Sequence, residues 1–252
     1  MKKIIIALLF VIFVSAGLST LGVFRRQNVA TPASIINNPT PTEIIKNKKY
    51  KSQLITVDDP SGLYLYPNYE EQANSKDLIN KNSCKSFVNA GFYSKDSSPL
   101  GLLISQGKLI NKDRKSELFN GYFSVTSESG VFITDSVPRN EVRIALQSGP
   151  ILIKDFSPQI LKLKQDEEAR RVVVATDKSG KIYFMVFYSE DSFFSGPFLK
   201  DLPQIVEDFE RDSNLKFDNA LNLDGGSASA FYSEDFFLSE LNHVGSFFCI
   251  LE

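Results

Sequence analysis

One short segment late in the chain combines a carboxylate with residues that leave room around it. Asp224 follows the largely apolar run at residues 219–223 and precedes Gly225, Gly226 and Ser227. Glycines after a strand let the chain turn sharply and let a ligand approach the backbone closely. An ordinary Asp-Gly turn explains the same residues, so a catalytic and a structural interpretation are equally open here.

A second segment places a side-chain amide at the end of a predicted strand. Asn89 follows Phe87-Val88, Gly91 stands two residues further on, and Asp96 lies in the polar stretch after them. An asparagine amide both donates and accepts hydrogen bonds, so it can orient a ligand. A strand end with an Asx turn is the competing explanation and, for this segment alone, the stronger one.

A third segment interrupts apolar sequence with polar residues. Gln147, Ser148 and Gly149 stand between the apolar runs 144–146 and 151–153. Such a break lines a cleft in one interpretation and forms a β-bulge in the other.

The composition limits the chemistry that these segments can perform. The 252 residues include one His, two Cys and no Trp, and the formal net charge is -2. One histidine cannot build a three-His metal site, two cysteines cannot build a four-thiolate zinc site, and the near-zero charge gives no reason to expect a nucleic-acid partner. We therefore expect chemistry by carboxylates, hydroxyls, amides, Arg and Lys, with no metal and no other cofactor.

Several residues that invite a functional interpretation are better explained structurally. His243 is expected in a turn, the acidic run 166–168 in a solvated loop, and most of the paired phenylalanines in the core. Only Phe193 and Phe194, on a short loop before Ser-Gly-Pro, are candidates for stacking against a sugar.

Strand signals outnumber helix signals in the rest of the chain. Alternating apolar residues and Asp/Gly turns predict a hairpin of 54–57 with 63–66, a second hairpin of 171–175 with 181–188, and a final strand at 244–251.

One helix is predicted clearly and a shorter one more weakly. Asp201 and Pro203 suit the start of a helix, and Ile205, Val206 and Phe209 share one face of it. The charged residues expected away from that face are Glu207, Asp208, Glu210 and Arg211. Residues 77–80 are the shorter helical piece.

The N-terminus predicts a membrane-directed helix. Residues 4–24 are uncharged, with Lys2-Lys3 before them and Arg25-Arg26 after them, which is long enough to cross a bilayer. A signal peptide cleaved near Val14-Ser15-Ala16 is the alternative. We expect an uncleaved signal anchor with the domain outside the membrane, while the cleaved and secreted form stays open.

The chain therefore divides into three parts. Residues 1–26 are the signal anchor or signal peptide, 27–49 a flexible linker rich in Pro, Thr and Asn, and 50–252 one domain. We predict an α+β fold for that domain, with a mixed, largely antiparallel β-sheet and a few flanking helices. Cys84 and Cys249 can pair outside the membrane, but their positions in sequence do not decide whether they do.

The motifs, in this order and spacing, resemble the phosphodiester glycosidase domain family. That family includes the lysosomal uncovering enzyme of animals and bacterial proteins described as exopolysaccharide-biosynthesis proteins. The resemblance covers about residues 57–252. It depends on Asn-Ala-Gly-Phe-Tyr at 89–93 with Asp-Ser-Ser-Pro-Leu-Gly-Leu at 96–102, Phe-Asn-Gly-Tyr-Phe at 119–123, Gln-Ser-Gly-Pro-Ile-Leu at 147–152, an arginine at 171 and Asn-Ala-Leu-Asn-Leu-Asp-Gly-Gly-Ser at 219–227. The family commonly has glycine where this chain has Ala90 and a third glycine before Ser227, which leaves the identity of the substrate in doubt.

The resemblance implies hydrolysis of a sugar-1-phosphodiester at its glycosidic C–O bond. A phosphate leaves readily, so little acid catalysis is needed, and the oxocarbenium-like transition state favours a nearby carboxylate. We assign that role to Asp224, as a base toward water or as a stabiliser of the sugar cation. Arg171 would hold the phosphate, although Arg170 beside it is the alternative because adjacent residues of a strand face opposite sides.

The remaining candidates would bind the substrate. Asn89 is the third catalytic candidate and orients sugar hydroxyls or phosphate oxygens, and Asp96 would supply a second carboxylate. The other substrate-binding candidates are Gly91, Gln147, Ser148, Gly149, Gly225, Gly226 and Ser227.

Two other functions remain open at this point. One is a surface domain that binds glycan or phosphate without catalysis, and the other is a phosphodiesterase that cleaves P–O. In the primary interpretation the domain is membrane-anchored and acts outside the cytoplasm on the cell envelope or its polysaccharides.

Overall fold

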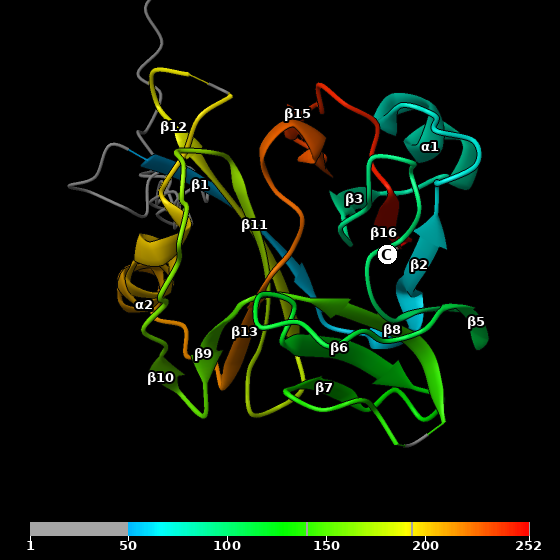
Figure 1. Cartoon of the computed structure of the whole chain (residues 1–252), viewed down its shortest axis with the longest axis horizontal. Coiled ribbons are helices and arrows are strands. Elements are labelled where there is room, and N and C mark those ends of the chain that lie inside the picture. Colours follow the sequence, from blue (N-terminus) through cyan, green and yellow to red (C-terminus); the bar gives the residue numbers. More distant parts are fainter. Residues whose placement is uncertain (1–49, 140, 193, 252) are drawn as a thin grey trace, which may run out of the picture. The chain divides into compact units, whose positions relative to one another are not determined.

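The computed structural model describes residues 50–139, 141–192 and 194–251, which form three antiparallel β-sheets with two helices (Figure 1). The first sheet has the order β1 (Tyr50–Val57), β12 (Ile182–Ser189), β11 (Arg171–Thr176), β13 (Asn219–Asn222), β9 (Ile151–Lys154) and β10 (Ser157–Pro158). The second has the order β15 (Phe236–Leu238), β14 (Phe231–Ser233), β3 (Ser86–Asn89), β16 (Ser246–Ile250) and β2 (Leu63–Pro67). The third has the order β5 (Lys108–Asn111), β4 (Leu103–Ser105), β8 (Val142–Ser148), β6 (Gly121–Thr126) and β7 (Val131–Thr134).

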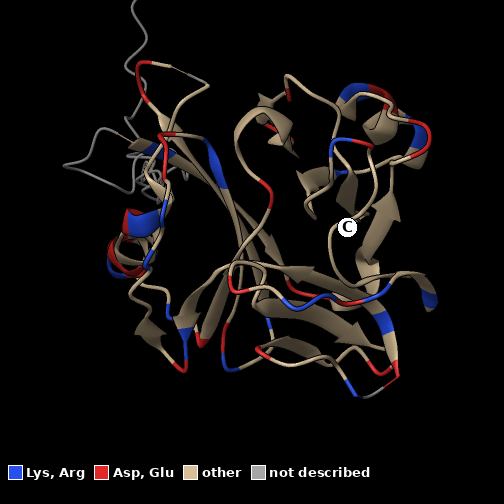
Figure 2. Ribbon diagram, viewed as in Figure 1, with Lys and Arg blue, Asp and Glu red and all other residues tan. Residues whose placement is uncertain are grey.

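The three sheets share one hydrophobic core. Val174 of the first sheet, Phe248 of the second and Phe123 of the third all belong to it and are fully buried. Successive side chains of a strand point to opposite faces, so Val173 faces a separate apolar cluster on the other side of the first sheet. Lys, Arg, Asp and Glu lie mainly on the loops and helices, with few on the strands (Figure 2).

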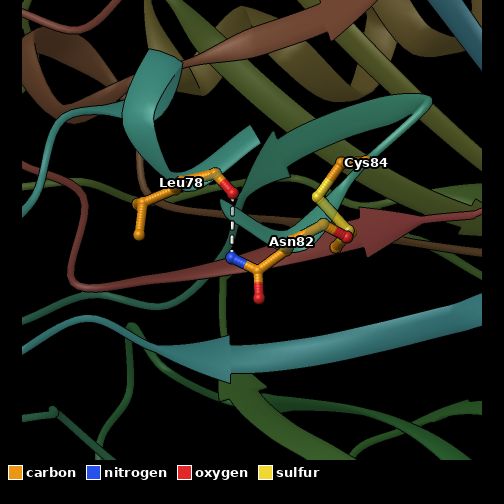
Figure 3. The surroundings of a disulfide bond; sticks show 4 residues. Leu78, Asn82 and Cys84 are labelled. Carbon is orange, nitrogen blue, oxygen red and sulfur yellow. Dashed lines mark hydrogen bonds between the residues drawn. A yellow bond between two sulfur atoms is a disulfide. The ribbon is translucent and has the colours of Figure 1, made fainter. Parts of the chain in front are cut away.

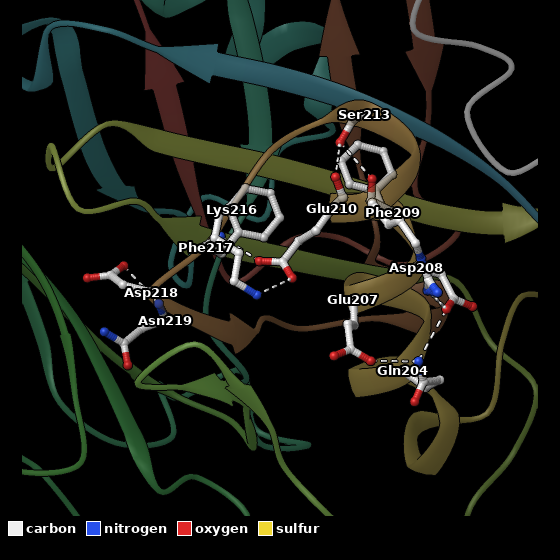
Figure 4. A network of polar contacts seen from close by, with 11 residues as sticks. Gln204, Glu207, Asp208, Phe209, Glu210, Ser213, Lys216, Phe217, Asp218 and Asn219 are labelled. Atoms are coloured by element: carbon white, nitrogen blue, oxygen red, sulfur yellow. Dashed lines mark hydrogen bonds and ion pairs between the residues drawn. The ribbon is translucent and has the colours of Figure 1, made fainter.

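The predicted helix is confirmed as α2 (Leu202–Ser213), and it covers the outer face of the first sheet. Ile205, Val206 and Phe209 are buried in the cluster that Val173 joins. The prediction for Glu210 is wrong, because its side chain is only 3% exposed. Its carboxylate accepts a hydrogen bond from the backbone N–H of Phe217, since the chain turns back there toward β13 (Figure 4).

Helix α1 (Ser75–Asn82) extends the short helix expected at 77–80 and packs against the second sheet. The Asn82 amide donates to Leu78 O at 2.8 Å, and Cys84 stands two residues further along the chain (Figure 3). Cys84 forms a disulfide with Cys249 of β16, which answers the question left open by the sequence. This bond joins the segment after α1 to the last strand.

The hairpin of β11 with β12 is confirmed, and so is the final strand β16. The predicted pairing of 54–57 with 63–66 is wrong: β1 pairs with β12, and β2 pairs with β16. The 3-10 helix Pro60–Gly62, which Asp59 caps, carries the chain from the first sheet to the second instead of folding it back. The predicted α+β class with largely antiparallel strands is confirmed. The prediction of a mixed sheet is corrected, because every strand pair in the described ranges is antiparallel and the strands form three sheets.

The anchor or signal peptide and the linker fall on residues 1–49, outside the described residues. Within the described part of the chain, no helix is long and apolar enough to cross a membrane.

Candidate functional site

The segments that carry Asn89 and Asp224 meet where two sheets come together. The backbone N–H of Asp224 donates to Ala90 O at 3.0 Å, and Asn89 Nδ2 donates to Asp224 O at 2.7 Å. These bonds join the end of β13 in the first sheet to the end of β3 in the second. The carboxylate at 224 is therefore held by two strands far apart in sequence.

The carboxyl group of Asp224 has an unusual environment. It is desolvated, and that burial raises its pKa to about 7, although the hydrogen bond from Gly225 N–H to Oδ1 (2.9 Å) acts in the opposite direction. No arginine or lysine contributes to this shift. A carboxyl group with this pKa exchanges its proton near neutral pH, which is a requirement for acid–base catalysis at that pH.

Two tyrosines lie close enough to Asp224 to be affected by its charge: Tyr69, which belongs to no sequence motif, and Tyr93, the last residue of the Asn-Ala-Gly-Phe-Tyr motif. Burial raises the pKa values of Tyr69 and Tyr93, and the charge of Asp224 raises both further. Both rings pack on Gly245, where a Cβ would lie 2.7 Å from Tyr69 Cε1 and 2.8 Å from Tyr93 Cδ1. Tyr93 Oη donates to His243 O at 2.8 Å, so the segment before β16 holds this ring in place.

His243 itself lies beside this group. Its ring packs against that of Tyr93, with ring centroids 4.8 Å apart, and its Nε2 lies 3.3 Å from Ser97 Oγ. The residue lies in the connection into the last strand, as expected, but it packs against the candidate site there.

Arg170 lies on the same side of the first sheet as the common core. It is 1% exposed, its Nε donates to Gly226 O at 3.3 Å, and its Nη1 donates to Ser239 O at 2.8 Å. Its Nη2 is enclosed and has no hydrogen-bond partner among the described residues. Burial lowers the pKa of Arg170, while the charge of Glu240 opposes that shift. Since an arginine stays protonated in proteins, the site contains a buried cation with an unused donor.

A second unused donor lies close to the first. Ser229 Oγ is enclosed without a partner in the described structure, and Ser229 N donates to Gly226 O at 3.2 Å, the same carbonyl that Arg170 contacts. A Cβ on Gly225 would lie 2.7 Å from Arg170 O, and Gly226 has φ +62°, so both positions require glycine. A guanidinium and a hydroxyl with free hydrogens around one turn suit an anion.

Arg171 lies on the opposite face of β11. Its Nε donates to Pro197 O at 3.0 Å, and its Nη2 lies 3.4 Å from Asp166 Oδ1. Asp166 also accepts hydrogen bonds from the backbone N–H groups of Leu199 and Lys200. The first residue of the acidic run therefore fixes the start of the α2 segment, and of the two arginines it is Arg170 that lies beside Gly226.

Several predicted ligand contacts are already used within the protein. Asn89 Oδ1 accepts a hydrogen bond from Ala230 N at 3.0 Å. Since Asn89 Nδ2 donates to Asp224 O, both the oxygen and the nitrogen of this amide are bonded to backbone groups. Gln147 is 1% exposed. Its Oε1 accepts from the N–H groups of Leu102 and Arg114, and its Nε2 donates to two further carbonyls. These side chains position the loops around the site.

The structure gives the neighbours of Gln147 similar roles. Ser148 Oγ donates to Asn222 O at 2.7 Å, and Asn222 Nδ2 donates to Gly149 O at 2.9 Å. A Cβ on Gly149 would lie 2.2 Å from Leu118 O. This segment joins the third sheet to the first just before Asp224.

The last three candidates lie in different surroundings. Gly91 N donates to Ser246 Oγ at 3.0 Å, close to Gly245 and the two tyrosines. Ser227 is exposed, and its Oγ accepts from Asn242 Nδ2 at 2.8 Å. Asp96 is also exposed, and its carboxylate accepts hydrogen bonds from Ser94 and Ser98 of its own turn, which lower its pKa.

In the ranges that the structure describes, no group of three or more His, Cys, Asp and Glu side chains is arranged to hold a metal ion.

Comparison with known proteins relates this site to a family and a fold. A family model described as phosphodiester glycosidase matches residues 82–247. The chain is similar to the catalytic domain of zebrafish N-acetylglucosamine-1-phosphodiester alpha-N-acetylglucosaminidase, auto-inhibited by its pro-peptide. That match has a TM-score of 0.59 and 14% identity over 84% of this chain and 87% of that one. A hypothetical protein from Synechocystis matches with a TM-score of 0.57 and 14% identity over 80% of this chain and 59% of that one. No curated protein sequence matches.

Proposed function

The chain belongs to the phosphodiester glycosidase family, and on that premise we propose that it hydrolyses the glycosidic C–O bond of sugar-1-phosphodiesters. Water forms the new bond to C1 of the sugar, and the C1–O bond breaks with its electron pair on the phosphate oxygen. The products are a free sugar and a phosphomonoester.

The observation that carries this proposal is the environment of Asp224. A carboxylate that only stabilised a sugar cation would work best with an ordinary, low pKa, because it must be ionised throughout. A pKa of about 7 instead suits a group that accepts the proton of the attacking water. We therefore assign Asp224 the role of general base.

We assign the phosphate to Arg170 rather than to Arg171. Arg170 has an unused Nη2 beside Gly226, whereas Arg171 is paired with Asp166 on the other face of the strand. Ser229 Oγ would donate a second hydrogen bond to the phosphate. Gly225 and Gly226 keep this part of the site free of side chains, so the sugar at Asp224 and the phosphate at Arg170 are neighbours.

The disulfide supports a location outside the cytoplasm, because structural disulfides persist in oxidising compartments and are rare in the cytosol. With the apolar segment at residues 4–24, this favours an anchored or secreted enzyme that acts on the cell envelope or its polysaccharides.

The reaction can be tested with a methyl phosphodiester of N-acetylglucosamine 1-phosphate, since the zebrafish protein is named for that sugar. The full-length protein is incubated with it in oxygen-18 water, and the products are analysed by mass spectrometry. Label in the sugar supports C–O cleavage, and label in the phosphate would identify a phosphodiesterase instead. If the protein binds this diester saturably but hydrolyses neither it nor the phosphodiesters of other sugars, the domain is a binding domain rather than an enzyme.

A further inference from the structure

Phe194 is a partly exposed aromatic residue beside the buried guanidinium. Its ring centroid lies 5.8 Å from Arg170 Cζ, and the residue is 59% exposed. Of the other two aromatic residues in this loop, Phe193 lies outside the described residues, and Phe198 is partly buried with Lys200 Nζ 5.3 Å from its ring centroid. The loop between β12 and the 3-10 helix Leu199–Asp201 thus presents one large apolar ring to solvent above Arg170.

The loop is held in this place by backbone contacts. Ser189 N donates to Ser195 O at 2.9 Å, and Ser195 N donates to Ser192 O at 3.2 Å. A Cβ on Gly196 would lie 2.5 Å from the carbonyl oxygen of Ala169, which is the residue before Arg170. The close approach of Gly196 fixes the loop against the segment that carries the guanidinium.

Cation–π attraction accounts for the position of the ring over Arg170, but it leaves most of the ring in water. Other conspicuous phenylalanines do not share this arrangement. Phe247 and Phe248 are buried, and Phe237, which is 47% exposed, packs edge-on against Tyr232 with ring centroids 6.0 Å apart. Among these, Phe194 alone combines an exposed ring with a buried cation that has an unused donor.

Arg170 contacts both the turn that follows Asp224 and the ring of Phe194. Its Nε donates to Gly226 O at 3.3 Å, and its Cζ lies 5.8 Å from the Phe194 ring centroid. A phosphate bound at Arg170 therefore lies next to Phe194, so that the alcohol esterified to it can contact this ring while the sugar lies at Asp224.

We propose that Phe194 is the specificity-determining residue for that alcohol, and that it selects alcohols carrying a ring with an apolar face over small alkyl alcohols. This inference rests on the proposed function, because it takes the phosphate to lie at Arg170. Sugar and aromatic rings both present such a face, and either gains from covering an exposed phenyl ring.

The test compares full-length wild-type protein with Phe194→Ala on two substrates, the benzyl and the methyl phosphodiesters of one sugar 1-phosphate. Both are alkyl esters, so their phosphates leave with similar ease. We expect kcat/KM for the benzyl ester to fall about five- to tenfold in the variant, the size of one aromatic contact, with less than a twofold change for the methyl ester. Phe237→Ala, which removes an exposed ring elsewhere, should change neither.

An equal loss on both esters, or no loss on the benzyl ester, would overturn the proposal. If the wild type cleaves neither ester, the proposed function fails, and the ring is then tested by binding. Benzyl phosphate and methyl phosphate are titrated against both proteins by calorimetry. A benzyl preference that Phe194→Ala removes supports the subsite, and equal affinities in the wild type contradict it.

Discussion

At the scale of single residues, Asp224 owes its proton affinity to exclusion from water rather than to a charged partner. If the carboxylate accepts the proton of water, Asp224→Asn should lower kcat by about 10²–10⁴-fold, the usual contribution of such a group. The wild-type rate should rise with pH through about 7 and then level off, because only the ionised form is active. Steady-state kinetics from pH 5 to 9 measures both.

Asp96→Asn is the matched control for this substitution, since Asp96 is exposed and bonded within its own turn. It should keep wild-type turnover. If Asp224→Asn retained more than about a tenth of the wild-type rate, its role as base would be lost, because general base catalysis is worth more than that.

The same carboxyl group links stability to pH. Its folded-state pKa of about 7 exceeds the ordinary value of 3.8, so its contribution to the free energy of unfolding is fully present below about pH 4 and is lost as pH rises through 7. Asp224→Asn removes the buried charge. We expect the Tm of the variant to exceed that of the wild type at pH 8, by about 2–4 °C for each kcal/mol gained, and to equal it at pH 4. If the Tm of Asp224→Asn differed from that of the wild type by the same amount at pH 4 and pH 8, the substitution would act only through packing, which would contradict this linkage.

Arg170 and Arg171 are adjacent arginines whose side chains point to opposite faces. Arg170→Lys keeps the charge but loses the planar fork of donors, so it should raise KM for the phosphodiester about tenfold, the size of one charge-assisted hydrogen bond. Arg171→Lys should leave KM unchanged, because its partners are Pro197 O, Glu167 O and Asp166 on the other face of the strand. If KM rose for Arg171→Lys and stayed unchanged for Arg170→Lys, Arg171 would be the phosphate-binding residue instead.

At the scale of secondary-structure elements, the turn after α2 depends on Glu210. Its buried carboxylate accepts from Phe217 N–H and pairs with Lys216 Nζ at 3.2 Å. Glu210→Ala leaves a buried backbone donor without a partner, so the free energy of unfolding should fall by about 1–3 kcal/mol in urea titrations. Glu207→Ala, which only loses a contact with Gln204 on the helix surface, should stay within about 0.5 kcal/mol. If both substitutions lowered the free energy of unfolding equally, the buried hydrogen bond from Phe217 N–H to Glu210 would contribute no more than a surface contact.

The elements that the sequence predicts well are those specified locally. The β11–β12 hairpin has its own turn at 177–180, and α2 has its own apolar face. The partner of β1 could not be found in this way, because Leu54 pairs with Met185 while the nearby turn residues only lead to another sheet. Pairing between distant segments depends on the packed core, which no local pattern encodes.

The residues of the candidate site also divide into those that a local sequence pattern predicts and those that only the fold brings to the site. The Asp224 and Asn89 segments stand out in sequence because both are strand ends with glycines, and the structure brings them together. Tyr69 gave no signal, because only folding places its loop against Gly245. Arg170 and Arg171 differ by one residue, and a one-residue change in strand phase reverses which side chain faces the site.

At the scale of the whole molecule, all three sheets contribute to one core, and the disulfide joins the segment between α1 and β3 to the last strand, β16, through residues 165 positions apart. β3, whose end contacts the Asp224 segment, pairs with β16, and the disulfide ties the residues just before β3 to the same strand. Structural disulfides persist in oxidising compartments, so this bond supports the proposed location outside the cytoplasm.

This compartment can be tested directly through the two cysteines. If the domain lies outside the cytoplasm, Cys84 and Cys249 should be fully oxidised in cells, because disulfides persist in oxidising compartments while the cytosol keeps thiols reduced. Cells are quenched with acid, and the denatured protein is then treated with a maleimide reagent, with and without a reductant. We expect labelling only after reduction. Cys249→Ser serves as the control, since it frees Cys84 and should be labelled without reductant. Wild-type protein labelled before reduction would place the domain in a reducing compartment and contradict the proposed location, while the assignment of Asp224 as the base would stand on its own kinetics.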